Sequence, residues 1–171
     1  MKNEKAGVIK LLILDVDGIL TSGQLFYNEN GQQTKSFNVK DGLGIQLLIK
    51  NNINVAIITG MKSKIVLNRA HDLGINHIFQ NQMDKSVALK KLLNYLNLTS
   101  KQVACMGDDL PDLTLFSKVG LSIAVNDAHP FIKKYAKWIT KKDGGKGAVR
   151  EVCDNLLRIQ GKLEKIYNKY L

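Results

Sequence analysis

Two aspartates, Asp15 and Asp17, follow an apolar run near the start of the chain, in the stretch LLILDVDGILT. Carboxylates this close repel each other unless a cation lies beside them or one of them holds a proton. Alternate residues of a strand point to the same side, so both side chains are expected to face one site. The pair either ends a strand in an ordinary polar turn or is arranged around a cation and a reaction.

Two more apolar runs end in polar residues, at Thr59-Gly60 and in GDDLPD, which contains Asp108, Asp109 and Asp112. If these strands lie side by side, their ends bring five carboxylates into one crevice. Such a crevice needs a divalent cation, and hard oxygen ligands favour Mg²⁺, which also binds phosphate oxygens. The sequence therefore predicts a Mg²⁺-dependent enzyme that acts on a phosphate ester. The expected metal ligands are Asp15, Asp17 and Asp108, with Asp109 and Asp112 around them.

Each residue has an expected role in phosphoryl transfer. Asp15 is placed to attack phosphorus and form an aspartyl-phosphate. Asp17 can protonate the leaving oxygen and then accept a proton from water. The hydroxyl of Thr59 and the backbone N–H of Gly60 can bind phosphoryl oxygens. Lys85, at the expected start of a helix, can neutralise the phosphoryl group.

Short apolar runs alternate with amphipathic stretches along the chain, which indicates an α/β fold with a central parallel sheet and helices on both faces. In such open sheets, ligands bind at the carboxyl ends of the strands, where the polar residues above lie. The expected strands are residues 8–16, 54–60, 102–109, 120–125 and 136–140. Apolar residues at helical spacing fill the gaps and predict one inward-facing stripe per helix: Leu43, Leu47 and Leu48; Ile65, Val66 and Ala70; Val87, Leu92, Leu93 and Leu96; and Val149, Val152, Leu156 and Ile159.

The stretch QLFYNENGQQTKSFNV interrupts this rhythm after the first strand. Two β-prone runs around Asn30-Gly31 predict a β-hairpin, inserted at about residues 24–38. Its position at the carboxyl end of the first strand would let it cover or flank the site. A basic helical tail is expected at about residues 158–171, and the whole chain, 1–171, is expected to form one domain.

The chain has 171 residues, a net charge of +10 and 44% hydrophobic residues, which is typical of a globular protein. No apolar run is long enough to span a membrane, and the charged start MKNEKAGVIK does not resemble a signal peptide, so we expect a cytoplasmic protein that does not bind membranes. Cys105 and Cys153 are expected to be reduced and buried, and His71 and His77 to lie at the surface.

Two other classes of function are alternatives to a phosphomonoesterase. The positive charge favours a nucleic-acid-binding or end-processing protein, but the lysines are spread singly with almost no aromatic residues between them, so no nucleic-acid partner is expected. A catalytically idle scaffold would not need the intact set of acidic and basic residues described above.

The motifs DxDGxLT, Thr-Gly, an isolated lysine and GDDxxD, in this order, resemble the haloacid dehalogenase superfamily of phosphatases from about Leu11 to Asp112. The stretches FNVKDGLGI, AIITGMKSKIV, VGLSIAVNDAHP and GGKGAVREVCD are similar to the 3-deoxy-D-manno-octulosonate 8-phosphate phosphatase family across nearly the whole chain. This resemblance implies a Rossmann-like fold without a large cap domain and a role in lipopolysaccharide precursor synthesis. It also implies a homotetramer that the hairpin builds, in which C-terminal tails help to close the sites of neighbouring subunits.

The resemblance also implies which residues bind the sugar-acid phosphate. Asp17 and Gly60 are among them, and Arg69 and Lys85 would bind its anionic groups. The remaining expected contacts form one segment, Asn38, Val39, Lys40, Asp41 and Gly42.

Two positions depart from the family's usual pattern. Met61 and Gln46 stand where the family commonly has arginine. Both changes remove a cation near an anionic substrate, so a nine-carbon keto-sugar acid phosphate stays open as the alternative substrate.

Overall fold

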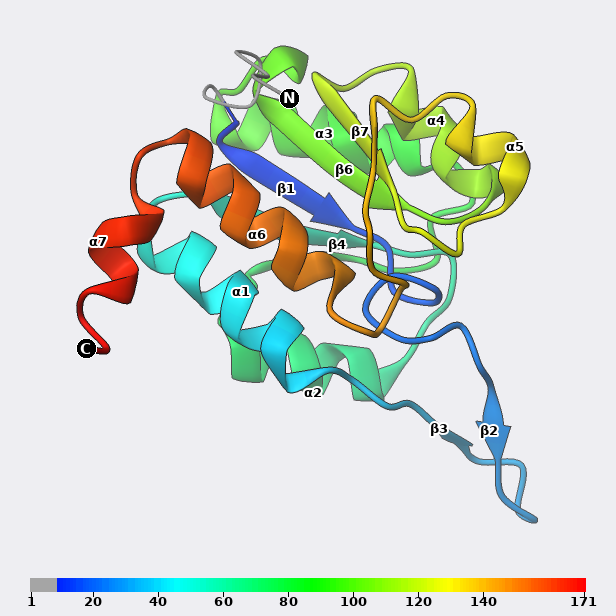
Figure 1. Cartoon of the computed structure of the whole chain (residues 1–171). Helices are drawn as coiled ribbons and strands as arrows, with labels where there is room; N and C mark the ends of the chain where they lie inside the picture. The colour runs from blue at the N-terminus through cyan, green and yellow to red at the C-terminus, as the bar shows by residue number, and fades with distance from the viewer. Residues whose placement is uncertain (1–8) are drawn as a thin grey trace.

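The computed structural model describes residues 9–171 (Figure 1). Val8, the expected first residue of the first strand, and the charged segment of residues 1–8 lie outside the described residues. Among the described residues, no helix combines the length and the apolar character that a membrane crossing requires.

A central sheet of six parallel strands forms the middle layer of the fold. The first strand is apolar throughout and fully buried, as expected for a parallel strand that helices cover on both faces. In spatial order the strands are β5 (His77–Phe79), β4 (Asn54–Ile58), β1 (Leu11–Leu14), β6 (Val103–Gly107), β7 (Leu121–Ala124) and β8 (Trp138–Ile139).

The register of the three central strands brings their carboxyl ends to one level. Leu14 of β1 is paired with Ile57 of β4 on one side and with Met106 of β6 on the other. The residues that follow these strands therefore start at the same edge of the sheet. This alignment is what assembles a site from segments more than ninety residues apart in the chain.

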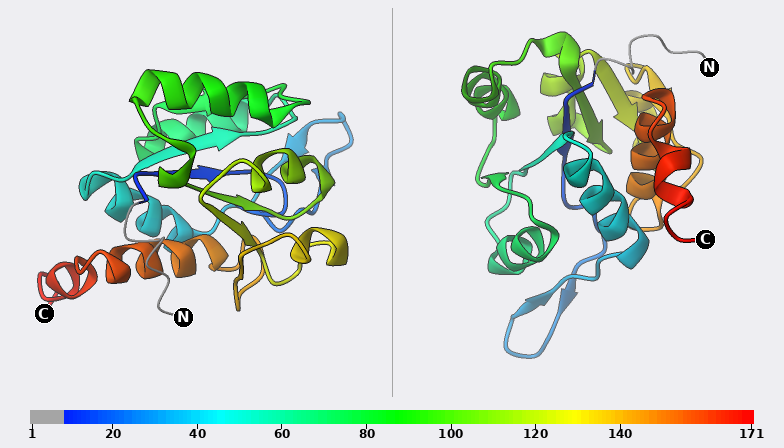
Figure 2. Two further views of the ribbon diagram at one scale, coloured as in Figure 1. Left: turned by 90° about the horizontal axis from the view of Figure 1, so that it is seen from above. Right: turned by 90° about the vertical axis from the view of Figure 1, so that its left-hand side faces the viewer.

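Helices cover both faces of the sheet, as predicted (Figures 1 and 2). α1 and α6 pack against each other on one face with α2 beside α1, while α3 and α4 pack together on the opposite face. The helices are α1 (Val39–Lys50), α2 (Lys64–Leu73), α3 (Lys85–Leu96), α4 (Leu113–Phe116), α5 (Pro130–Lys133), α6 (Ala148–Ile159) and α7 (Leu163–Tyr167), with short 3₁₀ turns η2 (Ser100–Gln102) and η3 (Leu110–Asp112).

The expected hairpin is present between β1 and α1 as the antiparallel pair β2 (Phe26–Tyr27) and β3 (Gln33–Thr34). It projects away from the sheet as a thin arm (Figure 1). Gly31 at its tip has a φ of +72°, the left-handed conformation that the Asn-Gly signal predicts.

All five expected strands are present, each shorter than its sequence range, and the structure adds a sixth. His77 lies in this extra strand, β5, and is half-buried, so its expected surface position was wrong. The run HIF is too short to show a strand pattern by itself. It becomes a strand because its backbone pairs with Ala56–Ile58 of β4.

Three apolar side chains of the predicted helix stripes are exposed: Leu43 near the start of α1, Val87 and Ile159. Val87 lies at the first turn of α3 and Ile159 at the last residue of α6, and both are about half exposed. The other residues of the α6 stripe, Val149, Val152 and Leu156, are buried as predicted. A helix end extends beyond the sheet that covers its middle, so periodicity overestimates burial there.

Candidate active site

A buried ion cluster lies at the carboxyl edge of the sheet. The Lys85 ammonium donates to Asp15 Oδ1 at 2.6 Å and to Asp112 Oδ1 at 2.6 Å. Carboxylate oxygens of Asp15, Asp108 and Asp112 lie within 4.8 Å of one another. Asp15 follows β1, Asp108 follows β6, Asp112 ends η3 and Lys85 begins α3, so four separate elements supply this cluster.

The electrostatics of the cluster show an excess of negative charge. Burial and the nearby Asp112 carboxylate raise the pKa of Asp15 to about 6, despite its contact with Lys85. Burial and the charges of Asp15 and Asp112 raise the pKa of Asp108 to about 8. Burial lowers the pKa of Lys85, but Asp15 and Asp112 outweigh it, so the net shift is upward and the ammonium stays charged.

Three carboxylates around one ammonium leave two negative charges uncompensated, which matches a divalent cation. The second oxygen of Asp112 accepts from the backbone N–H of Asp108 at 3.0 Å, so both of its oxygens are engaged by protein donors. Asp15 and Asp108 therefore fit the role of metal ligands better than Asp112 does. The atoms that these carboxylates offer to a metal are all oxygens, which fits Mg²⁺.

Gly18 is needed for Asp108 to reach the cluster. Its φ is +89°, and a Cβ atom built there would lie 2.0 Å from Asp108 Oδ2. Gly107 plays the same part for Asp112, whose Cβ lies 2.4 Å from a Cβ built on that glycine. The two glycines let the acidic side chains pack directly against the backbone.

Thr59 and Gly60 lie beside this cluster at the end of β4, the strand that pairs with β1. Thr59 is buried, and its Oγ1 accepts from the backbone N–H of Met61 at 3.4 Å, which leaves its own O–H free to donate. A Cβ built on Gly60 would meet no atom within 4 Å, so the backbone there borders open space. The hydroxyl of Thr59 and the backbone N–H of Gly60 can therefore donate hydrogen bonds to phosphoryl oxygens.

Asp17 is not one of the three carboxylates whose oxygens lie within 4.8 Å of one another. Its Oδ1 pairs with the ammonium of Lys35, which reaches it from the returning end of the hairpin. The Lys35 side chain is only 3% exposed, although the hairpin itself is exposed. The expected metal role of the Asp17 carboxylate stays a prediction, and in this structure its Oδ1 is paired with Lys35.

Sequence reasoning missed Lys35 as a site residue. The available signal was its position in QTKSFNV, at the end of a hairpin that was already expected to flank a carboxylate-rich crevice. A lysine there is the nearest cation that the insertion can offer. Single lysines are common on hairpins, however, and only the fold shows that this one turns inward.

The expected substrate-binding segment is divided between exposed and buried positions. Val39 and Lys40 are exposed, whereas Asp41 is buried and accepts from the backbone N–H groups of Gly147 and Arg150. Asn38 caps α1 through the N–H of Lys40. The Asp41 carboxylate therefore faces the start of α6, because burial requires hydrogen-bond partners for it.

Three other expected residues have clear positions. Arg69 of α2 lies against Gly42 and over the Phe37 ring, 5.8 Å from its centroid, at the base of the hairpin. Asp109 is exposed and accepts from the backbone N–H of Leu110, so it starts η3 rather than joining the cluster. Met61, at a position where the family commonly has arginine, is exposed, and its backbone N–H donates to Thr59.

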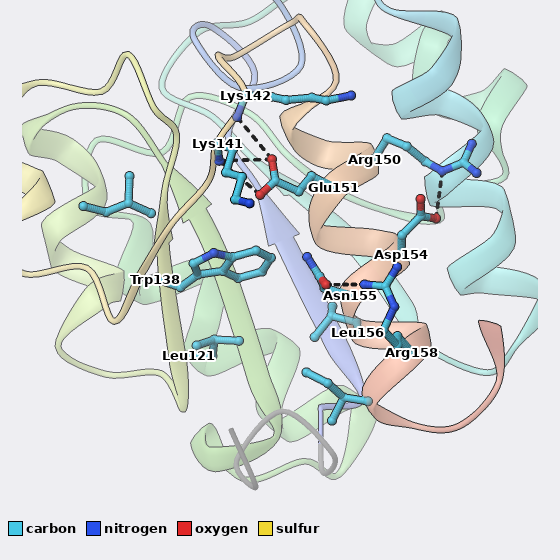
Figure 3. A pocket seen from close by; sticks show the side chains of 12 residues that line it. Leu121, Trp138, Lys141, Lys142, Arg150, Glu151, Asp154, Asn155, Leu156 and Arg158 are labelled. Carbon is cyan, nitrogen blue, oxygen red and sulfur yellow. Dashed lines mark hydrogen bonds and ion pairs between the residues drawn. The ribbon is translucent and has the colours of Figure 1, made fainter. Parts of the chain in front are cut away.

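A groove of about 630 Å³ opens elsewhere, between β7, β8 and α6 (Figure 3). Its lining includes Trp138, Leu121 and Arg158, and none of the residues of the ion cluster. The candidate active site is therefore the ion cluster at the strand ends, not this groove.

Comparisons with known proteins show which family this chain resembles. A family model described as haloacid dehalogenase-like hydrolase matches residues 63–152. The 3-deoxy-D-manno-octulosonate 8-phosphate phosphatase KdsC of Escherichia coli strain K12 is 50% identical over 161 residues, which cover 94% of this chain and 86% of that protein.

Solved structures show the same likeness. The 3-deoxy-D-manno-octulosonate 8-phosphate phosphatase of Moraxella catarrhalis, solved in complex with a magnesium ion, a phosphate ion and KDO, has a TM-score of 0.96 and 44% identity, covering 99% of this chain and 98% of that one. The Yersinia pestis enzyme has a TM-score of 0.93 and 49% identity, covering 94% of this chain and 87% of that one. Relatives this similar extend over nearly all of the described fold, and the chain therefore belongs to the 3-deoxy-D-manno-octulosonate 8-phosphate phosphatase family of haloacid dehalogenase-like hydrolases.

Proposed function

We propose that this chain is a Mg²⁺-dependent phosphomonoesterase that hydrolyses 3-deoxy-D-manno-octulosonate 8-phosphate, a reaction that serves lipopolysaccharide precursor synthesis. The observation that carries the proposal is the buried cluster in which Lys85 bridges Asp15 and Asp112 beside Asp108. A polar turn would not bury two carboxylates against one ammonium with a third carboxylate beside them, because the desolvation of so many charges costs several kcal/mol per ion, on the order of the whole stability of a domain.

Asp15 and Asp108 would hold the magnesium ion, with Asp17 close by. When bound, this ion neutralises the carboxylates and withdraws charge from the phosphoryl oxygens. The protein supplies the remaining contacts. Lys85 and the hydroxyl of Thr59 bind phosphoryl oxygens, with the Gly60 N–H beside them, and so favour the transition state over the ground state.

The reaction takes place in two displacements. A carboxylate oxygen of Asp15 forms a bond to phosphorus while the bond from phosphorus to the sugar oxygen breaks, and Asp17 gives its proton to that oxygen. Water then attacks the aspartyl-phosphate after losing a proton to Asp17. Phosphate leaves, and Asp15 returns as a carboxylate.

The test of the mechanism is Asp15→Asn, which removes the nucleophile and keeps its shape. Phosphate release should be abolished, while the circular dichroism spectrum stays that of the wild type. Asp72→Asn, on the outer side of α2, makes the same chemical change at an exposed position and should leave turnover intact. Near-normal turnover of Asp15→Asn would sink the proposed mechanism.

The choice of sugar needs its own test, because Met61 and Gln46 lack the positive charge that the family commonly has there. Phosphate release from the eight-carbon and the nine-carbon keto-acid phosphates should be compared side by side, with and without Mg²⁺. We expect the eight-carbon ester to have the higher kcat/KM. A clear preference for the nine-carbon ester would change the substrate and leave the chemistry in place.

We also propose a homotetramer without a large cap domain, in which the hairpins meet. Leu25, Phe26 and Tyr27 on the hairpin are more than half exposed, an apolar surface suited to contact another copy. Deleting residues 25–37 should give monomers on a sizing column, and surviving tetramers would exclude this role of the hairpin. Closure of a neighbour's site by the C-terminal tail, a cytoplasmic location, the absence of a nucleic-acid partner and one domain over 1–171 stay predictions.

A further inference from the structure

Residues 141–147, which we call the glycine loop, cross the base of the hairpin insertion. The backbone N–H of Gly145 donates to the carbonyl of Ile19, in the turn that leads from β1 to the insertion, at 2.9 Å. The carbonyl of Gly145 accepts from Asn38 Nδ2, at the returning end of the insertion, at 3.3 Å. One residue of the glycine loop thus connects the turn before the hairpin to the residue that ends it.

The glycine loop also packs without clearance on the turn that follows β1. A Cβ built on Gly144 would lie 1.7 Å from the carbonyl oxygen of Gly18, and one built on Gly145 would lie 2.5 Å from the nitrogen of Ser22. Gly18 lies against Asp108 in turn, and Asp17 precedes it. Any displacement of the glycine loop therefore moves the backbone that presents Asp17 and supports Asp108.

Two carboxylates anchor the ends of the glycine loop. Glu151 of α6 accepts from the backbone N–H groups of Lys141 at 3.0 and 3.1 Å and of Lys142 at 3.1 Å, as Figure 3 shows. Asp41 of α1 accepts from Gly147 at 3.3 Å and from Arg150 at 2.7 Å. The Glu151 anchor is exposed to solvent, whereas Asp41 is 2% exposed, so the Asp41 contacts have no competition from water.

We propose that Asp41 is a positioning residue of the reaction: through the glycine loop it holds the Gly18 turn, and with it Asp17, in the geometry that phosphoryl transfer requires. This role rests on the proposed function. It differs from the direct substrate contact that the family resemblance implies for Asp41, because the carboxylate is buried and spends both oxygens on backbone N–H groups.

The kinetic test is Asp41→Asn, which keeps the size of the side chain and removes one of its two acceptor oxygens. We expect kcat to fall about tenfold with KM within about twofold of the wild type, because misplaced catalytic groups weaken transition-state contacts more than ground-state binding. Gly144→Ala, which pushes the glycine loop off Gly18 without touching Asp41, should give the same pattern. Both the eight-carbon ester and p-nitrophenyl phosphate should be used.

The matched control is Ser122→Ala. Ser122 is also fully buried, and its hydroxyl also makes two backbone hydrogen bonds, to Tyr135 and from Lys137, but on β7 and away from the cluster. This variant should lower Tm and leave kcat and KM unchanged. If Asp41→Asn behaves like the control, Asp41 is only a helix cap, and if it raises KM with kcat kept, Asp41 contacts substrate. Either result overturns the proposal.

A second measurement does not depend on any substrate. Amide hydrogen exchange at Gly145, whose N–H bonds Ile19, should become at least tenfold faster in Asp41→Asn, while exchange in the centre of β1 stays the same. Unchanged exchange at Gly145 would show that Asp41 does not hold the glycine loop.

The two substrates separate this proposal from the proposed function. If the wild type hydrolyses p-nitrophenyl phosphate but not the eight-carbon ester, the proposed sugar is refuted and the positioning role of Asp41 is left intact.

Discussion

Gly18→Ala isolates the packing of Asp108 from the chemistry of its carboxylate. A Cβ atom at Gly18 would lie 2.0 Å from Asp108 Oδ2, and its φ of +89° also disfavours any side chain. Ordinary non-bonded contact is roughly 3.5 Å, so the Asp108 carboxylate or the turn must move by about 1.5 Å. A misplacement of about 1 Å at a catalytic group can cost a factor of about 100 in rate, so we expect a loss of at least that size in kcat/KM.

The matched control for this variant is Gly74→Ala. Gly74 ends α2 with a φ of +76°, and a Cβ built there meets no atom within 4 Å. Both alanines therefore bear a similar backbone penalty, about 1–2 kcal/mol for the left-handed conformation, and both should lower Tm. Only Gly18→Ala displaces a group of the acidic cluster, so only it should lose activity.

The assay combines steady-state phosphate release with Mg²⁺ binding followed by calorimetry. Gly18→Ala should need a higher Mg²⁺ concentration for half-maximal activity, because Asp108 is one of the proposed Mg²⁺ ligands, while Gly74→Ala should match the wild type. If Gly18→Ala keeps kcat/KM within about threefold of Gly74→Ala, the close packing of Gly18 and Asp108 does not determine the geometry of the site, and the reasoning fails.

Two further predictions concern charge. In metal-free protein the free energy of unfolding, measured in urea, should fall as pH rises from about 4 to 8. The reason is that folded Asp108, with its pKa raised to about 8, keeps a proton that an unfolded aspartate loses near 3.9. A free energy of unfolding that rises over this window would contradict the uncompensated charge of the cluster, and Mg²⁺ should raise Tm more at pH 8 than at pH 5. Lys85→Met leaves Asp15 and Asp112 without their cation, so it should cost about 3 kcal/mol near pH 8, and less at low pH where Asp15 is protonated.

Local patterns predicted the parts of this protein whose physics is local. Apolar runs and helical stripes located five of the six strands and the long helices, and Asn30-Gly31 located the hairpin. The strand β5 was missed because three residues carry too little pattern, and it forms only through pairing with β4. Leu43, Val87 and Ile159 were misassigned because the periodicity of a helix does not show where the sheet beneath it ends.

The sequence by itself determined the chemistry: which residue types are present, in which order, and that they follow strands whose carboxyl ends meet. Only the tertiary structure decided how these groups are partnered. Lys85 connects Asp112 to Asp15, Asp17 forms an ion pair with Lys35, and Asp41 is buried against the start of α6. The physical reason is that a buried charge must find a partner, and that partner comes from whichever segment the packing brings near, not from the neighbours in the chain.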